Sequence, residues 1–106
     1  MYAIAFDMDT ALLEKAYPNV SYNNAYAEIA KYLRNLGFER QQGSVYFGDA
    51  TVDAVKCVLA VQSLTRDFAW FGPSVRDIRM LRIEDNNDLK PAIEQVLSFS
   101  RGNENN

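Results

Sequence analysis

Two carboxylates follow an apolar segment near the start of the chain. Residues 3–13 read AIAFDMDTALL, so Asp7 and Asp9 come where a buried strand would end and a polar turn would begin. Acidic side chains at the end of a strand commonly bind metals or take part in phosphoryl chemistry. The first question that this sequence poses is which chemistry uses Asp7.

One candidate chemistry is that of haloacid-dehalogenase-type phosphatases. In these enzymes the first Asp of a DxD motif attacks phosphorus and the second acts as acid and base, beside a divalent cation. They need a doubly wound parallel sheet and a lysine on a later strand. After Asp9 this chain offers a hairpin and a last strand ending in Glu84 and Asp85, without such a lysine. The phosphatase is therefore the least favoured interpretation.

The composition limits the possible functions. The chain has 106 residues, which fits one domain, and its formal net charge is −3 with no histidine. The absence of histidine from the sequence excludes histidine general bases and histidine-ligated metal sites. The acidic balance argues against bulk electrostatic binding of nucleic acid, but a local basic patch or a metal would still hold RNA.

The sequence also indicates a location. No apolar run approaches the roughly 20 residues that cross a bilayer, so we expect no membrane association. The chain starts with the strand-like YAIAF and lacks a basic leader, so we expect no secretory signal. Cys57 is the single cysteine and is expected to be buried as a small hydrophobic side chain. These features predict a cytoplasmic protein.

Hydrophobic periodicity predicts an α+β fold with the order β-α-β-β-α-β and a C-terminal helix, which is the ferredoxin-like arrangement. The second helix is expected to be capped by Asp49 or Thr51, and its apolar positions, expected to face the core, are Val52, Val55, Val58, Leu59 and Val61. One ferredoxin-like domain over residues 1–100 and a flexible polar tail over residues 101–106 are predicted. The expected strands are residues 2–7, 38–40, 44–47 and 75–83, and the clearest helices are residues 23–36 and 88–99.

This topology suggests where the charged residues meet. We expect the first and third strands to be neighbours and parallel, which would bring Asp7 close to Asp49. The start of the last strand would bring Arg76 to the same edge. Asp7 and Asp49 are then candidate ligands for Mg²⁺ or Mn²⁺, which prefer oxygen. Asp49 suits the N-cap of a helix at least as well.

Three arginines recur at every third position of the last strand. Arginine binds phosphate through paired hydrogen bonds, so Arg76 and Arg79 are candidate substrate-binding residues. Side chains alternate along a strand, so the three arginines cannot share one face, and at least two are expected to pair with nearby carboxylates. Ser44 either simply begins a strand or contacts a phosphate and takes part in catalysis. The arginines are Arg76, Arg79 and Arg82, and the carboxylates are Asp77, Glu84 and Asp85.

Three segments resemble the virulence-associated protein D (VapD) family. They read MYAIAFD at 1–7, LGFERQQGSVY at 36–46 and WFGPSVRDIRMLRIED at 70–85. The resemblance implies a ferredoxin-like homodimer related to the small CRISPR-adaptation nucleases. It also implies an endoribonuclease that is the toxin of a toxin–antitoxin pair, with an antitoxin as protein partner. In that family pattern Asp7 is the essential position, whereas Asp9 lies outside the pattern.

The chemistry of RNA supports the same residue independently. RNA carries its own nucleophile, the 2′-hydroxyl, so a ribonuclease needs a base, a held phosphate and stabilised charge. Without histidine, the base or metal ligand is a carboxylate, and Asp7 is the first candidate. A catalytically silent dimer that binds RNA or a protein remains the alternative. The sequence therefore predicts a homodimeric endoribonuclease with RNA as substrate.

Overall fold

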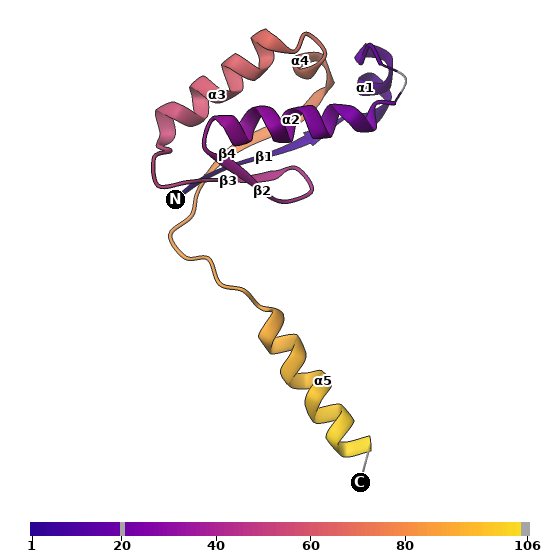
Figure 1. The fold of residues 1–106 in the computed structure, drawn as a ribbon, viewed down its shortest axis with the longest axis vertical. Coiled ribbons are helices and arrows are strands. Elements are labelled where there is room, and N and C mark those ends of the chain that lie inside the picture. The colour runs from indigo at the N-terminus through magenta and orange to yellow at the C-terminus, as the bar shows by residue number, and fades with distance from the viewer. Residues whose placement is uncertain (20, 105–106) are drawn as a thin grey trace.

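The computed structural model describes residues 1–19 and 21–104, with side chains up to residue 100. The order of its elements confirms the ferredoxin-like α+β arrangement with a C-terminal helix (Figure 1). The elements are β1 (Tyr2–Met8), α1 (Thr10–Ala16), α2 (Asn23–Asn35), β2 (Phe38–Gln42), β3 (Val45–Gly48), α3 (Ala54–Asp67), α4 (Phe71–Ser74), β4 (Val75–Arg82) and α5 (Lys90–Glu104).

The four strands form one sheet in the order β2-β3-β1-β4, and every neighbouring pair is antiparallel. The predicted parallel pairing of β1 with β3 is therefore wrong. The crossover through α2 leaves β2 parallel to β1, and the hairpin then reverses the chain, so β3 must run against β1. An antiparallel sheet also lacks the parallel core that a haloacid-dehalogenase-type phosphatase needs.

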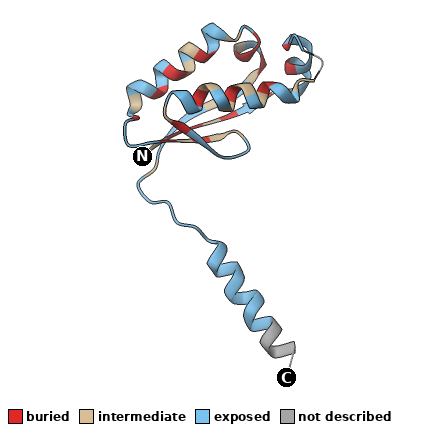
Figure 2. Ribbon diagram, viewed as in Figure 1, coloured by how far each residue is buried: buried red, intermediate tan, exposed pale blue. Residues whose placement is uncertain are grey.

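The two faces of the sheet differ. Ile4, Phe6 and Met8 of β1 join the hydrophobic core on the face that α2 and α3 cover (Figures 1 and 2). Ala3, Ala5 and Asp7 alternate onto the opposite face. Their cross-strand neighbours there include Leu81, Phe47 and Val45. Asp7 thus stands on the face of the sheet away from α2 and α3.

Local signals explain most element ends. Gly37 ends α2 with a φ of 95°, and Gly43 turns the β2–β3 hairpin with a φ of 50°. The predicted cap of α3 is wrong, because Asp53 accepts the N–H of Lys56 at 2.8 Å instead. Asp49 lies outside the helix and accepts hydrogen bonds from the amide and the hydroxyl of Thr51.

Helix α3 buries a different face from the predicted one. Its buried side chains are Cys57, Ala60 and Leu64, which confirms the burial predicted for Cys57. Val55, Val58 and Leu59, predicted for the core, are exposed instead. Both faces carry apolar residues at helical spacing, so periodicity alone could not select the buried one.

Helix α5 projects from the rest of the molecule (Figure 1). It confirms the predicted last helix but continues to Glu104, so residues 101–104 are helical rather than a frayed tail, and residues 105–106 lie outside the described part. The radius of gyration is 18.1 Å, against about 13 Å for a compact chain of this length. The packed body therefore ends with β4. Among the described helices, none is long and apolar enough to cross a membrane.

Candidate active site

Arg76 lies between two carboxylates at the C-terminal end of β1. Its Nη1 is 3.8 Å from Oδ2 of Asp7, and its Nη2 donates a hydrogen bond to Oδ2 of Asp9 at 3.3 Å. The side chains of Arg76 and Asp7 are each 63% exposed. Ion pairs open to water are weak, so the guanidinium can exchange Asp7 for another anion such as a phosphate.

Asp9 has a structural role that the sequence interpretation missed. It is the N-cap of α1 and accepts the N–H of Leu12 at 3.1 Å. That bond, together with Arg76, lowers the pKa of Asp9 from its ordinary value of 3.8. Its own N–H donates to the carbonyl of Ser74 at 2.7 Å. Asp9 is therefore a fixed, ionised group that holds Arg76 beside Asp7, not a bystander in a solvated turn.

A fourth charged residue, Asp77, faces Asp7 across the strands. The two are direct partners in the β1–β4 register, and like charges in such positions repel each other. Arg79 Nε donates to both oxygens of Asp77 at 3.1 Å and so compensates for this repulsion. Arg82 pairs with Glu84 at 3.4 Å, which confirms that at least two arginines have carboxylate partners.

These contacts separate the two candidate phosphate binders. Arg79 already has a paired contact with one carboxylate, whereas Arg76 is shared loosely between two. Arg76 is thus the better placed of the two for a substrate phosphate. The substrate-binding role of Arg79 stays a prediction.

Ser44 lies at the same end of the sheet as Asp7. Its carbonyl accepts the N–H of Phe6 at 3.1 Å, because antiparallel pairing brings the start of β3 to the end of β1. Sequence reasoning selected both residues but did not expect them to be neighbours. The catalytic role of Ser44 stays a prediction.

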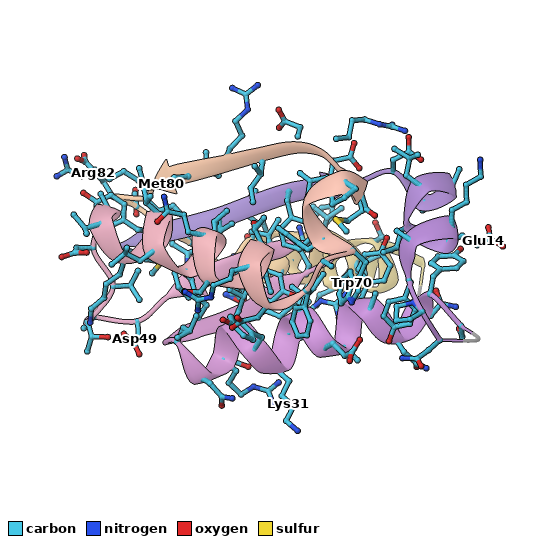
Figure 3. The ribbon with its side chains drawn as sticks, turned by 90° about the horizontal axis from the view of Figure 1, so that it is seen from above. Glu14, Lys31, Asp49, Trp70, Met80 and Arg82 are labelled. Atoms are coloured by element: carbon cyan, nitrogen blue, oxygen red, sulfur yellow. The ribbon has the colours of Figure 1, made fainter. Side chains whose placement is uncertain are left out.

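Asp49 lies at the opposite end of the sheet. Its N–H donates to the carbonyl of Gly37, and it follows β3 beyond the start of β1. Figure 3 shows Asp49 at one end of the molecule and Glu14 of α1 at the other. A strand of this length spans about 20 Å. The predicted metal site of Asp7 with Asp49 is therefore wrong, because it depended on a parallel β3.

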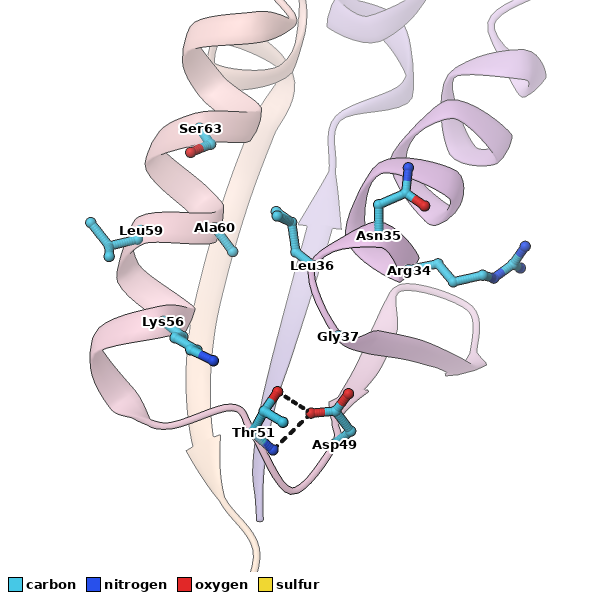
Figure 4. A pocket seen from close by; sticks show the side chains of 10 residues that line it. All are labelled: Arg34, Asn35, Leu36, Gly37, Asp49, Thr51, Lys56, Leu59, Ala60 and Ser63. Atoms are coloured by element: carbon cyan, nitrogen blue, oxygen red, sulfur yellow. Dashed lines mark hydrogen bonds between the residues drawn. The ribbon is translucent and has the colours of Figure 1, made fainter.

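Asp49 instead lines a cavity of about 560 Å³ between α2 and α3 (Figure 4). The hydroxyl and amide of Thr51 lower its pKa from the ordinary value of 3.8. Leu36, Leu59 and Lys56 line the same cavity.

The carboxylates at the Asp7 end do not form a complete metal site in one copy. Nowhere in the described residues do three His, Cys, Asp or Glu side chains gather as metal ligands. Asp9 and Asp77 are each bonded to an arginine. A Mg²⁺ or Mn²⁺ ion at Asp7 would therefore need oxygen ligands from another molecule.

A hollow of about 410 Å³ lies beside Arg76. Its lining combines the charged Arg76 and Asp77 with the apolar Val75, Ile78 and Phe71. A phosphate at the guanidinium would thus have an adjoining partly apolar space for an attached sugar or base.

Comparison with known proteins identifies the family. The family model of CRISPR associated protein Cas2 matches residues 1–90. The chain belongs to the Cas2 family. It is 52% identical to Endoribonuclease VapD 2 of Riemerella anatipestifer, over 88% of this chain and 99% of that protein. It is 50% identical to an Endoribonuclease VapD homolog of Helicobacter pylori, over 92% of this chain and all of that protein. The predicted resemblance to VapD is thereby confirmed.

Proposed function

We propose that this protein is an endoribonuclease in which Asp7 is the essential group and Arg76 holds the substrate phosphate. The observation that carries the proposal is the exposed Asp7–Arg76–Asp9 arrangement at the end of β1. The relatives named Endoribonuclease VapD support RNA as the substrate class.

The arrangement suits attack by the ribose 2′-hydroxyl. Asp7 accepts the hydroxyl proton as the 2′-oxygen forms a bond to the neighbouring phosphorus. The bond from phosphorus to the 5′-oxygen breaks, and that oxygen takes a proton from water. Arg76 stabilises the charge that develops on the phosphate oxygens. The products are a 2′,3′-cyclic phosphate and a 5′-hydroxyl end.

The proposal includes a homodimer that packs through the open face of the sheet. This face carries Asp7 toward one end and the apolar Phe47 and Leu81 toward the other, on either side of the buried Ala3. Leu81 is 44% exposed in one copy. A second copy would cover these apolar side chains and bring its own Asp7 to the same cleft.

Ser44 and a metal enter the proposal as additions to this core. Ser44 would contact a phosphate oxygen beside Asp7. Mg²⁺ or Mn²⁺ held between the Asp7 carboxylates of two copies would neutralise phosphate charge.

The biological role that we propose is that of a toxin in the bacterial cytoplasm, controlled by an antitoxin protein. The similarity to VapD proteins supports this role. Induced expression of the chain is expected to stop growth, whereas an Asp7→Asn chain at the same level is not. Growth arrest by both chains would contradict a toxic effect through RNA cleavage.

The direct test is cleavage of a structured RNA by purified protein, with and without EDTA. Asp7→Asn is expected to lower the rate at least 100-fold, because the proton acceptor is lost. Asp49→Asn is the matched control: the same chemical change at the other end of the sheet is expected to leave the rate within about twofold. Circular dichroism of both variants checks that they fold.

Three outcomes decide between the alternatives. Equal cleavage by wild type and Asp7→Asn would sink the catalytic proposal. Tight RNA binding by the wild type without any cleavage would favour the catalytically silent dimer. If EDTA abolishes cleavage and the products formed without EDTA carry 3′-hydroxyl ends, metal-assisted hydrolysis would replace the 2′-hydroxyl mechanism.

A further inference from the structure

The pairing of β1 with β4 becomes irregular at Arg76. The regular part of the register ends with Asp7 opposite Asp77. The next residue of β1, Met8, then lies opposite Val75 rather than opposite Arg76. In the described register Arg76 is therefore an extra residue without a cross-strand partner, and the two strands form a β-bulge there.

The bulge keeps Arg76 out of the row of side chains that faces the core. Residues directly opposite each other in an antiparallel pair have their side chains on the same face of the sheet. Met8 is buried in the core, so a regular register would place Arg76 beside it. Val75 takes this place and packs against the core instead. The side chain of Arg76 is left exposed and reaches Asp7 and Asp9.

Ser74, two residues before Arg76, is held by two hydrogen bonds. Serine is mostly exposed in proteins, but this side chain is completely buried. Its hydroxyl donates to the carbonyl of Trp70 at 2.7 Å, within the turn of α4. Its carbonyl accepts the N–H of Asp9 at 2.7 Å. The hydroxyl bond thus fixes the last residue of α4, and with it the direction of the carbonyl that Asp9 uses.

Asp9 links both sides of the bulge. Its main-chain N–H is bonded to Ser74, and its carboxylate is bonded to Arg76. Trp70 adds a second contact between α4 and α1, because its ring packs edge-on against the ring of Tyr17, the C-cap of α1, with centroids 5.1 Å apart. The bulge is therefore anchored to α1 through α4.

We propose that Ser74 is a positioning residue for RNA cleavage, because its two hydrogen bonds hold the β-bulge that presents Arg76 to the substrate phosphate. This inference rests on the role of Arg76 in the proposed function and adds the element that aims it. Ser74 is buried, so it acts through Arg76 and not on the RNA itself. Without the hydroxyl, the carbonyl that Asp9 uses is free to turn, and Arg76 moves away from Asp7. A displacement of about 1 Å near a reacting centre can slow a reaction roughly 100-fold.

The test is a double-mutant cycle on kcat/KM for cleavage of a structured RNA. It compares wild type, Ser74→Ala, Arg76→Ala and the double variant. Ser74→Ala is expected to lower kcat/KM about tenfold when Arg76 is present. In the Arg76→Ala background the same change is expected to lower it less than about twofold, because no arginine is left to position. Equal losses in both backgrounds would show a merely structural serine and would overturn the proposal.

Two further variants separate positioning from a general loss of stability. Tyr32→Phe also removes one hydroxyl hydrogen bond, the one to Asp67, and is expected to leave kcat/KM within about twofold. Ser74→Cys keeps the size of the side chain and a weak donor, so under reducing conditions its loss should be smaller than that of Ser74→Ala. Rates are expressed per folded molecule, which circular dichroism measures. A loss in Tyr32→Phe as large as that in Ser74→Ala would also overturn the proposal.

Amide hydrogen exchange tests the anchoring of the bulge without RNA. The N–H of Asp9 is bonded to the carbonyl of Ser74, so Ser74→Ala is expected to speed its exchange about tenfold, whereas Tyr32→Phe keeps the wild-type rate. Unchanged exchange at Asp9 in Ser74→Ala would overturn the inference. A wild-type protein that does not cleave RNA would contradict the proposed function, and exchange at Asp9 would still show whether Ser74 holds the bulge, so the two failures are distinguishable.

Discussion

The two ends of the central strand differ in how their acidic residues are used. At the C-terminal end, Asp7 is exposed and has only a loose ion pair with Arg76. At the other end, Asp49 is bonded to both the amide and the hydroxyl of Thr51, which fixes the loop that leads to α3. A carboxylate bonded within its own loop is structural, whereas one held only by an exposed ion pair is available to a ligand.

After Asp7→Asn, the largest expected effect comes from removing the arginine at the Asp7 end. Arg76→Ala is expected to lower kcat/KM for RNA cleavage roughly 100-fold, because charge on the phosphate loses its stabilising donor. Arg34→Ala, at the Asp49 end, removes an exposed arginine 3.9 Å from Glu39 and is expected to change kcat/KM less than twofold. Equal losses in both variants would mean that general positive charge, not position, matters.

A smaller effect is expected from crowding the Asp49 end. A Cβ on Gly48 would lie 2.7 Å from Cβ of the buried Val52 and 3.0 Å from the carbonyl of Tyr2. Gly48→Ala is therefore expected to lower the free energy of unfolding by about 1–3 kcal/mol. Chemical denaturation measures this change, and cleavage per folded molecule should stay constant. An unchanged free energy of unfolding would show that the loop after β3 shifts to accommodate the added Cβ without cost.

The two N-caps offer a third contrast. Asp53→Ala removes the cap of α3 and is expected to lower the free energy of unfolding by about 1 kcal/mol without affecting cleavage. Asp9→Ala removes the cap of α1 and also frees Arg76, so cleavage should fall as well. Urea denaturation and RNA cleavage of both variants separate stability from activity. Unchanged cleavage by Asp9→Ala would contradict the role of Asp9 in positioning Arg76.

The smallest expected effect is a pH dependence that both ends share. Hydrogen bonds lower the pKa values of Asp9 and Asp49 in the fold. Each group therefore stabilises the fold above its ordinary value of 3.8, and this contribution is lost as pH falls through the lower folded value. The difference in Tm between wild type and Asp9→Asn should be constant at neutral pH and shrink below about pH 4. A difference that persists in acid would exclude ionisation as its cause.

Sequence reasoning found the elements but not their pairing directions. The apolar run of β1, the glycine after α2 and the β2–β3 turn are local signals, so residues near them predict local structure well. The direction of β3 relative to β1 is a property of the whole sheet, and an error there moved Asp49 to the wrong end. The position of Asp77 opposite Asp7 depends on the register of two distant strands. The capping role of Asp9 is a local signal that was missed because no helix was expected over residues 10–16. Writing out the antiparallel register of β1 against β4 would have placed Asp77 opposite Asp7.

The single thiol of this chain has a practical consequence. Cys57 is 2% exposed on the inner side of α3, and burial raises the pKa of its thiol. A thiol reagent can therefore react with it only when α3 separates from the sheet, so labelling kinetics report local opening at one defined residue. Cys57 also borders a groove of about 210 Å³ between α3 and β4, lined by Val58, Val61, Ile78 and Met80. A molecule that fills this groove and holds α3 against the sheet would therefore slow the labelling. The labelling rate of this one native thiol thus reports whether the groove is occupied.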